Sequence, residues 1–310
     1  MMRSAPPRQA GVALLVALLV VALATILIAG LLGHGELTAA RTRNQLREAQ
    51  ARAYADGLEA YAAKVLVEDN GNGGNIDTRD DIWAVPLPPT PVAGGTIAAM
   101  MQDLDGRFNL NNLSPDVANH EIWQHKFVLL LIALKLDPAL AGHVAEWMDG
   151  KTPASVDDAF YLAQSVPYRR AGRIFTHISE LRLVAGVDGD VYAALAPYVS
   201  ALPSGTPINV NTAAVPVLMT LSPNVTHEMA QAIWQQGGAH YGDLDAVRAA
   251  QPALTVIENP DCYGVHSSYF RARGIVTLDG LPFEFDSLIE RRPGGTDGGI
   301  HVLRRSRGGD

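Results

Sequence analysis

The sequence predicts an α+β protein, in which a long N-terminal helix accompanies a small antiparallel sheet and a large all-α domain is inserted into the sheet region. Three observations predict this fold class. An uncharged run near the N-terminus continues into an amphipathic stretch without proline. Strand-like segments occur both early and late in the chain, and the residues between them are helix-rich and repeat themselves.

Composition narrows the class of protein. The 310 residues are enough for about two domains. The formal net charge of −8 argues against binding nucleic acid through a basic face. Cys262 is the only cysteine, so the chain has no intrachain disulfide. Much of the apolar content lies in one N-terminal block, which argues against a plain cytosolic enzyme.

Residues 12–33 carry no charged side chain, and Thr25 is the only clearly polar one. A helix of this length spans roughly 33 Å, enough to cross the core of a bilayer. A signal peptide is the alternative, but its apolar region is usually about 7–15 residues. Arg3 and Arg8 precede the run, so we expect a single-pass transmembrane helix with a cytoplasmic N-terminus.

The junction between the basic leader and this helix resembles the type III signal of pilins and pseudopilins. The leader, residues 1–11, ends in Ala10-Gly11, and the apolar run begins at Val12. The resemblance implies that a prepilin peptidase cleaves the Gly11–Val12 bond and that Val12 becomes N-methylated. Most pilins carry a glutamate five residues into the mature helix, whereas this chain has Val16. A carboxylate in lipid needs a partner, so its loss suits a subunit at a filament tip.

Beyond the membrane, we expect the helix to continue to about Glu68. Residues 36–67 lack proline and contain one glycine, Gly57, and their apolar positions recur at helical spacing. Residues 69–75, rich in asparagine, aspartate and glycine, then form a loop. The prolines at 86, 88, 89 and 91 keep the following stretch extended.

Two strand pairs are predicted. Residues 96–101 and 107–110 form short strands around a turn at Asp105-Gly106, and residues 269–278 and 281–290 pair across Asp279-Gly280. Apolar side chains alternate with polar ones in the later pair, as in a half-buried sheet. The residues that follow, 293–310, are expected to be a disordered tail.

The middle of the chain repeats itself. Residues 108–111 (FNLN) match 208–211 (INVN), and residues 175–182 (FTHISELR) match 241–248 (YGDLDAVR). The paired signatures lie further apart in the first copy, which therefore carries an insertion, placed mostly at 149–174. We expect helical units at 108–207 and 208–255.

The second unit resembles the helix-hairpin-helix module of DNA-binding proteins. Its turn, residues 222–225, contains Pro223, which removes a backbone donor, and no lysine follows before Asp243. We therefore expect a packing unit. A membrane-tethered DNA-binding protein of the competence type is the alternative, and it requires salt-dependent binding of duplex DNA.

Taken together, the chain resembles the minor pseudopilin K family of type II secretion, the general secretion pathway. The resemblance rests on Gly11-Val12, Trp83-Ala84 with Pro86 and Pro88-Pro89, residues 103–113 (DLDGRFNLNNL), Pro167-Tyr168-Arg169, Ser179-Glu180-Leu181, residues 208–213 (INVNTA) and Ser268-Tyr269-Phe270.

This resemblance implies a pilin-like fold with an inserted domain of two SAM-like units. Residues 34–107 would then form the pseudopilin helix and the first part of the sheet, and residues 256–292 its C-terminal strands. The family implies an inner-membrane protein with a periplasmic bulk, at the tip of the pseudopilus with the minor pseudopilins I and J. The resemblance further implies that the subunit caps assembly and contacts the outer-membrane secretin or exported proteins.

No enzymatic constellation is found in the sequence. His120, His125, His143 and His177 are scattered and match no catalytic motif. His143 with Glu146 suits a metal by spacing, but a solvated helix face explains the pair better. No histidine signature surrounds Cys262.

The one plausible ligand is calcium. Asp149, Asp157 and Asp158 lie in or beside the insertion, and calcium prefers several oxygens from a bent loop. A calcium-binding member of the family adds to this suggestion, and a solvated acidic loop is the alternative. Asp69, Asn70 and Asn72 are a weaker second candidate, because their glycines also suit a simple turn.

Overall fold

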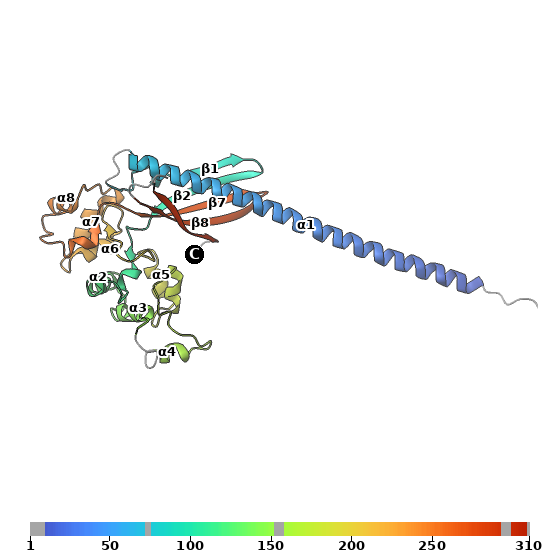
Figure 1. Ribbon diagram of the computed structural model, residues 1–310, viewed down its shortest axis with the longest axis horizontal. Coiled ribbons are helices and arrows are strands. Elements are labelled where there is room, and N and C mark those ends of the chain that lie inside the picture. The colour runs from blue at the N-terminus through green and yellow to red at the C-terminus, as the bar shows by residue number, and fades with distance from the viewer. Residues whose placement is uncertain (1–9, 72–75, 152–157, 293–298, 309–310) are drawn as a thin grey trace, which may run out of the picture. The chain divides into compact units, whose positions relative to one another are not determined.

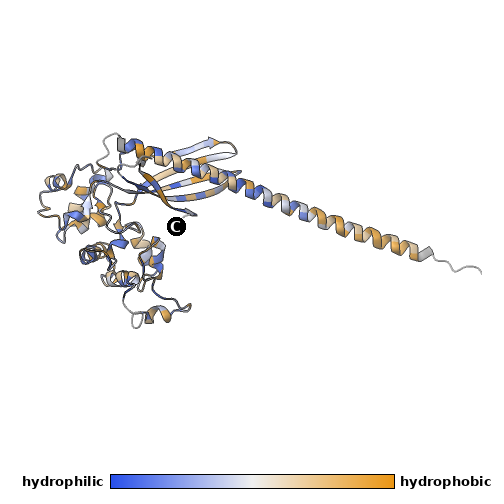
Figure 2. Cartoon of the chain, in the orientation of Figure 1, coloured by the Kyte–Doolittle hydropathy of each residue, from blue (hydrophilic) through white to orange (hydrophobic). Residues whose placement is uncertain are grey.

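The computed structural model describes residues 10–71, 76–151, 158–292 and 299–308 (Figure 1). They belong to two units, Met1–Tyr54 and Ala55–Asp310, and each is described by itself. The first unit is the N-terminal part of helix α1 (Ala10–Gly71). It is strongly apolar toward its N-terminus (Figure 2), and Val12 is 63% exposed. Among the described residues, α1 is the one helix long and apolar enough to cross a membrane.

The second unit contains a five-stranded antiparallel sheet in the order β1-β2-β7-β8-β9 (Figure 1). Its strands are β1 (Leu87–Val92), β2 (Gly95–Asp103), β7 (Tyr269–Leu278), β8 (Leu281–Arg291) and β9 (Ile300–Arg307). The predicted β7–β8 hairpin is confirmed. Asp279 and Gly280 both have positive φ, the conformation that a two-residue I′ turn requires.

The C-terminal part of α1 packs on this sheet. Ala62, Val65 and Leu66 form a small core with Trp83, Phe270 and Ile289. Leu58 approaches Gly274 so closely that a Cβ there would lie 3.0 Å from the leucine Cδ1. The C-terminal part of the apolar stripe expected beyond residue 36, including Ala62 and Val65, therefore covers the sheet, whereas Leu46 and Tyr61 are exposed. The helix ends at Gly71, close to the predicted end near Glu68.

Both early strands are present, but their predicted pairing was wrong. Residues 96–101 and 107–110 do not pair with each other, because β2 lies between β1 and β7, whereas β3 (Phe108–Asn109) pairs in parallel with β4 (Val199–Ser200). The chain does turn at Asp105-Gly106, but the carboxylate of Asp103 accepts both of their backbone N–H groups and directs the chain into the helical domain.

The expected disordered tail at 293–310 was also wrong, because residues 300–307 form β9 beside β8. The glycine pairs obscured a period-2 pattern in which Ile300 and Val302 pack on the small core under α1. Residues 293–298 and 309–310 lie outside the described residues. Both outer strands are irregular: β1 contains Pro88, Pro89 and Pro91, and β9 is bulged at Leu303 and carries three arginines.

The helical domain lies between β2 and β7 in sequence and has one continuous core. Its first unit comprises η2 (Leu110–Leu113), α2 (His120–Ala133), α3 (Leu140–Met148), α4 (Ala159–Leu162), η3 (Ile178–Leu183) and α5 (Gly189–Leu195). Its second comprises α6 (Val215–Leu218), η4 (Met219–Leu221), α7 (His227–Trp234), η5 (Gln235–Gly237), α8 (Leu244–Ala250) and η6 (Pro260–Cys262).

The structure supports the predicted repeat. In the first copy, the side-chain amide of Asn111 donates to the carbonyl of Phe175 and accepts the N–H of the same residue. Asn211 makes the same two hydrogen bonds with Tyr241 in the second copy. Both copies also contain a short parallel ladder, β3 with β4 and β5 (Ile208–Asn209) with β6 (Tyr263–Gly264). Because β6 closes the second unit, this unit extends to Gly264, past the predicted boundary at 255.

Candidate functional site

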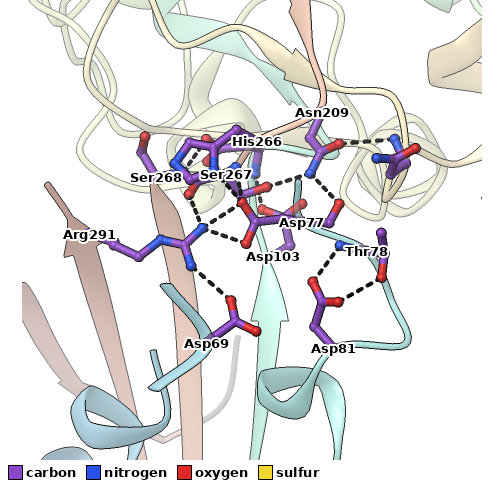
Figure 3. Close-up of polar contacts among 12 residues, drawn as sticks. Asp69, Asp77, Thr78, Asp81, Asp103, Asn209, His266, Ser267, Ser268 and Arg291 are labelled. Atoms are coloured by element: carbon purple, nitrogen blue, oxygen red, sulfur yellow. Dashed lines mark hydrogen bonds and ion pairs between the residues drawn. The ribbon is translucent and has the colours of Figure 1, made fainter. Parts of the chain in front are cut away.

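A concentration of buried and half-buried polar groups lies where the end of α1, the ends of β2 and β8 and the second helical unit meet (Figure 3). We call this region the polar junction. It contains Asp69, Asp77, Asp103, Asp105, Asn209, Thr212, His266, Ser267 and Arg291. Since residues from the sheet and from the inserted domain meet here, the junction determines how the two are joined.

Asp77 and Arg291 form the centre of the junction. The Nη2 of Arg291 lies 2.5 Å from both carboxylate oxygens of Asp77, and its Nη1 donates to Asp69 at 3.0 Å. Asp77 also accepts the backbone N–H of Ser267 at 2.6 Å, and the Nδ1 of His266 lies 2.7 Å from its Oδ2. Burial opposes ionisation of Asp77, but the hydrogen bond from His266 and the charge of Arg291 hold its pKa below the ordinary value.

Asp103 and Asp105 connect β2 to the second helical unit. Asp103 accepts the hydroxyl of Thr212, and the backbone carbonyl of Asp105 accepts the N–H of Asn209. The carboxylate of Asp105 accepts the N–H groups of Ser268 and Tyr269 at the start of β7. Burial raises the pKa of both carboxyl groups, and the negative charge of Asp103 raises that of Asp105 further.

Three carboxylates of this region, those of Asp69, Asp77 and Asp81, have ligand atoms within 4.8 Å of one another. The guanidinium of Arg291 contacts two of them and supplies the positive charge that a cation would bring. Asp81 is engaged by Thr78 and by the indole of Trp83. Asp69, the first residue of the weaker calcium candidate, therefore forms an ion pair with Arg291. Asn72 lies outside the described residues, as does the side chain of Asn70.

The first calcium candidate is described only in part, because Asp157 lies outside the described residues. Asp149 accepts the N–H of Lys151 at the end of α3. Asp158 is buried, and its carboxylate lies 3.5 Å from the Nε of Arg170 and 3.9 Å from Arg169. Neither oxygen of Asp158 has a hydrogen-bond partner among the described residues. Such oxygens fit a cation, and the adjacent arginines offset part of their charge.

The histidines and the cysteine lie apart from one another. His120 and His143 contact the carbonyls of Val117 and Ala185, and His177 caps η3. His143 is thus half-buried against the loop after η3 rather than on a fully solvated face. Cys262 is buried, and burial raises the pKa of its thiol, the opposite of what a nucleophile needs.

The predicted processing residues, Gly11 and Val12, lie at the start of α1, in the first unit. Val12 and Val16 are exposed, and their helix continues without interruption through the apolar run. The turn of the second unit, residues 222–225, buries Val225 in the core of the domain. This burial fits the expected packing role.

One functional side chain was missed from the sequence. Lys126 of α2 is fully buried and donates to the carbonyl of Glu258 at 2.9 Å and to the hydroxyl of Tyr263 at 3.0 Å, so it connects the two helical units. Burial lowers its pKa. The sequence feature that could have revealed Lys126 is its position on the apolar stripe of Trp123, Phe127 and Leu130, where a lysine is unexpected.

Fold and junction together define a class: a pilin-like protein with one apolar N-terminal helix and a helical domain inserted into its sheet. A family model described as "Type II secretion system (T2SS), protein K" matches residues 106–204. The type II secretion system protein K of Pseudomonas aeruginosa is 33% identical over 97% of this chain and 93% of its own length. That of Aeromonas hydrophila is 31% identical over 97% of this chain and 98% of its own.

A solved structure agrees with these relatives. A chain in the crystal structure of the GspK–GspI–GspJ complex of the enterotoxigenic Escherichia coli type 2 secretion system superimposes with a TM-score of 0.74. The match has 28% sequence identity and covers 87% of this chain and all of that one. The chain therefore belongs to the protein K family of type II secretion systems. The minor-pseudopilin role predicted from the sequence is confirmed, and the DNA-binding alternative finds no support.

Proposed function

We propose that this chain is the tip subunit of a type II secretion pseudopilus and assembles there with the minor pseudopilins I and J of its own system. The observation that carries the proposal is the match to the GspK–GspI–GspJ complex over 87% of the chain. Val16 supports a terminal position, since it offers no carboxylate to a subunit above it. The chain then starts and caps assembly as a structural subunit rather than an enzyme.

The proposal includes a processing step and a membrane topology. Prepilin peptidase cleaves the Gly11–Val12 bond, Val12 is N-methylated, and the remaining helix anchors the subunit in the inner membrane with its bulk in the periplasm. Arg3 and Arg8 on the short side support this orientation. From the tip, the SAM-like helical domain contacts the outer-membrane secretin or exported proteins.

Co-purification tests the assembly. Tagged full-length chain, expressed with the I and J pseudopilins of the same system, should retain both partners in mild detergent. Recovery of the chain without either partner would contradict the proposal. A duplex-DNA shift assay serves as the contrast, and we expect no salt-dependent binding.

Processing has its own test. Gly11→Ala should leave the leader attached, visible as a larger mass of the purified chain, while Gly30→Ala in the same helix should mature normally. Normal maturation of Gly11→Ala would count directly against the leader assignment.

We also propose that Asp149, Asp157 and Asp158 bind calcium, supported by the buried oxygens of Asp158, which accept no hydrogen bond among the described residues. Millimolar calcium should raise the melting temperature of the full chain in detergent. The shift should disappear in Asp158→Asn and persist in Asp190→Asn, an exposed aspartate of α5. An equal shift in both variants would place the ion elsewhere.

A further inference from the structure

The insertion in the first helical unit exposes apolar side chains that the fold does not need. Phe160 and Leu162 of α4 are 49% and 47% exposed, and Val166 is 76% exposed. Leu183, whose carbonyl accepts a hydrogen bond from the hydroxyl of Tyr168 in the same segment, is 44% exposed. We call these four residues, with Arg169, the α4 patch. Figure 1 shows α4 at the end of the helical domain that points away from the sheet.

The segment carrying the patch is held rigidly. Tyr161 is buried and contacts the rings of Trp147 and Tyr168, with centroids 5.5 and 5.6 Å away. The N–H of Tyr168 donates to the carbonyl of Tyr161, and that of Gly172 to the carbonyl of Trp147. Arg170, nearly buried, lies beside the carboxylate of Asp158. Side chains presented on such a preformed support lose little entropy when a partner binds.

Comparison of the two repeats indicates that the fold does not require the α4 patch. Both copies make the same pair of hydrogen bonds between an asparagine side chain and the backbone of an aromatic residue, and the second copy does so without the insertion. Within the insertion, Tyr161 and Tyr168 bury the apolar area required for its own anchoring. Phe160, Leu162 and Val166 add apolar area that faces solvent instead. Exposed apolar groups gathered in this way are typical of interaction sites.

Charge indicates the chemistry of the partner. Residues 159–175 contain three arginines and no acidic residue, in a chain whose net charge is −8. Arg170 and Arg173 pair with Asp158 and Glu180, and Arg169 also lies 3.9 Å from Asp158 but leaves its side chain 68% exposed. A second copy of the chain docking through the same patch would bring the same arginines and repel. Membrane-surface binding uses longer amphipathic helices, and α4 has only four residues.

We infer that the α4 patch is a docking site for another protein, through a segment in which acidic side chains adjoin apolar ones. The apolar residues fill the contact, and Arg169 pairs with a carboxylate at its rim. This inference rests on the proposed function, which places the helical domain in the periplasm, where the partner is met. It differs from assembly with the pseudopilins I and J, which follows from the whole-chain structural match.

Site-specific photo-crosslinking tests the inference in cells that carry the complete secretion system. A benzophenone amino acid replaces Leu162 in the full-length chain, and the control replaces Val256, an apolar residue of the second unit that is 56% exposed. We expect protein adducts from position 162, mapped by mass spectrometry to a segment with acidic and apolar residues. Adducts to lipid, to a second copy or to a basic segment overturn the inference, as do adducts no more abundant than at position 256.

Two substitutions then test the chemistry. Phe160→Ser and Arg169→Glu should each lower the adduct yield by about tenfold, the size expected when an anchor residue or a rim charge is lost or reversed. Arg169→Glu alters an exposed side chain, so this variant alone tests the inference if the Phe160→Ser protein fails to accumulate. An unchanged yield in Arg169→Glu overturns the inference. Loss of co-purification with I and J while adducts persist would instead count against the proposed function.

Discussion

Asn111 and Asn211 fasten the two helical units in the same way: each side-chain amide holds both backbone polar groups of an aromatic residue, Phe175 in one unit and Tyr241 in the other. The asparagines are buried, so no water replaces these bonds. Each asparagine therefore closes the loop of its unit onto the strand that opens it.

Replacing either asparagine by leucine should destabilise the domain by about 2–4 kcal/mol, because two buried backbone groups lose their partners. The measurement is thermal unfolding of the full chain in mild detergent, followed by near-ultraviolet circular dichroism. Asn224→Leu, in the exposed turn before α7, is the matched control and should change little. If Asn111→Leu melted like wild type, the hydrogen bonds between Asn111 and Phe175 would not contribute to stability.

Arg291→Met should cost about 3–5 kcal/mol, because it leaves the buried carboxylates of Asp69 and Asp77 without their cation. The side chain of the neighbouring Arg292 is 62% exposed, and its partner Glu290 keeps a hydrogen bond from the hydroxyl of Tyr269, so Arg292→Met should cost less than Arg291→Met. Denaturant midpoints of the two variants compare them directly. Equal costs would show that the junction tolerates an uncompensated charge.

The lowered pKa of Asp77 gives the stability a dependence on pH. Its ordinary value is 3.8, so the stabilising ionised form is fully effective above that pH and is lost as the pH falls through the folded-state value. The difference in melting temperature between wild type and Asp77→Asn should therefore shrink as the pH falls below about 4. Asp80→Asn, at an exposed site, should track wild type throughout. A constant difference for Asp77→Asn would exclude this linkage.

Lys126→Met should destabilise the helical domain by about 1–3 kcal/mol, since the carbonyl of Glu258 loses its donor inside the protein. The unbranched methionine fills most of the space, so packing changes little. Unfolding should then become less cooperative, because the substitution loosens the contact between the two units. Lys64→Met on the exposed face of α1 provides the comparison. Identical unfolding of both variants would show that Lys126 does not stabilise the contact between the two helical units.

Local patterns predicted much of this fold. The charge-free run, the amphipathic stripe ending near Gly71 and the Asp279-Gly280 turn are each encoded within a few neighbouring residues. The repeat was visible because both copies keep an asparagine and an aromatic residue in matching places. Strand β9 was missed because its glycine-rich flanks suggested disorder, and β3 because its partner lies far along the chain.

The polar junction could not be predicted in the same way. Its central bond joins Asp77 to Arg291 across most of the chain, and no local pattern marks either residue. Arg291 is one of two adjacent arginines in the sequence, and only the fold separates the buried one from the exposed one. Long-range ion pairs of this kind depend on which strand ends meet.

The two outer strands of the sheet have a consequence for how the subunit behaves when it is not assembled. The prolines of β1 remove backbone donors from one border, and the bulge and arginines of β9 disrupt the other. Neither border templates a further strand. Edge-to-edge pairing of unassembled subunits through backbone hydrogen bonds is therefore disfavoured, which lowers their tendency to form fibres.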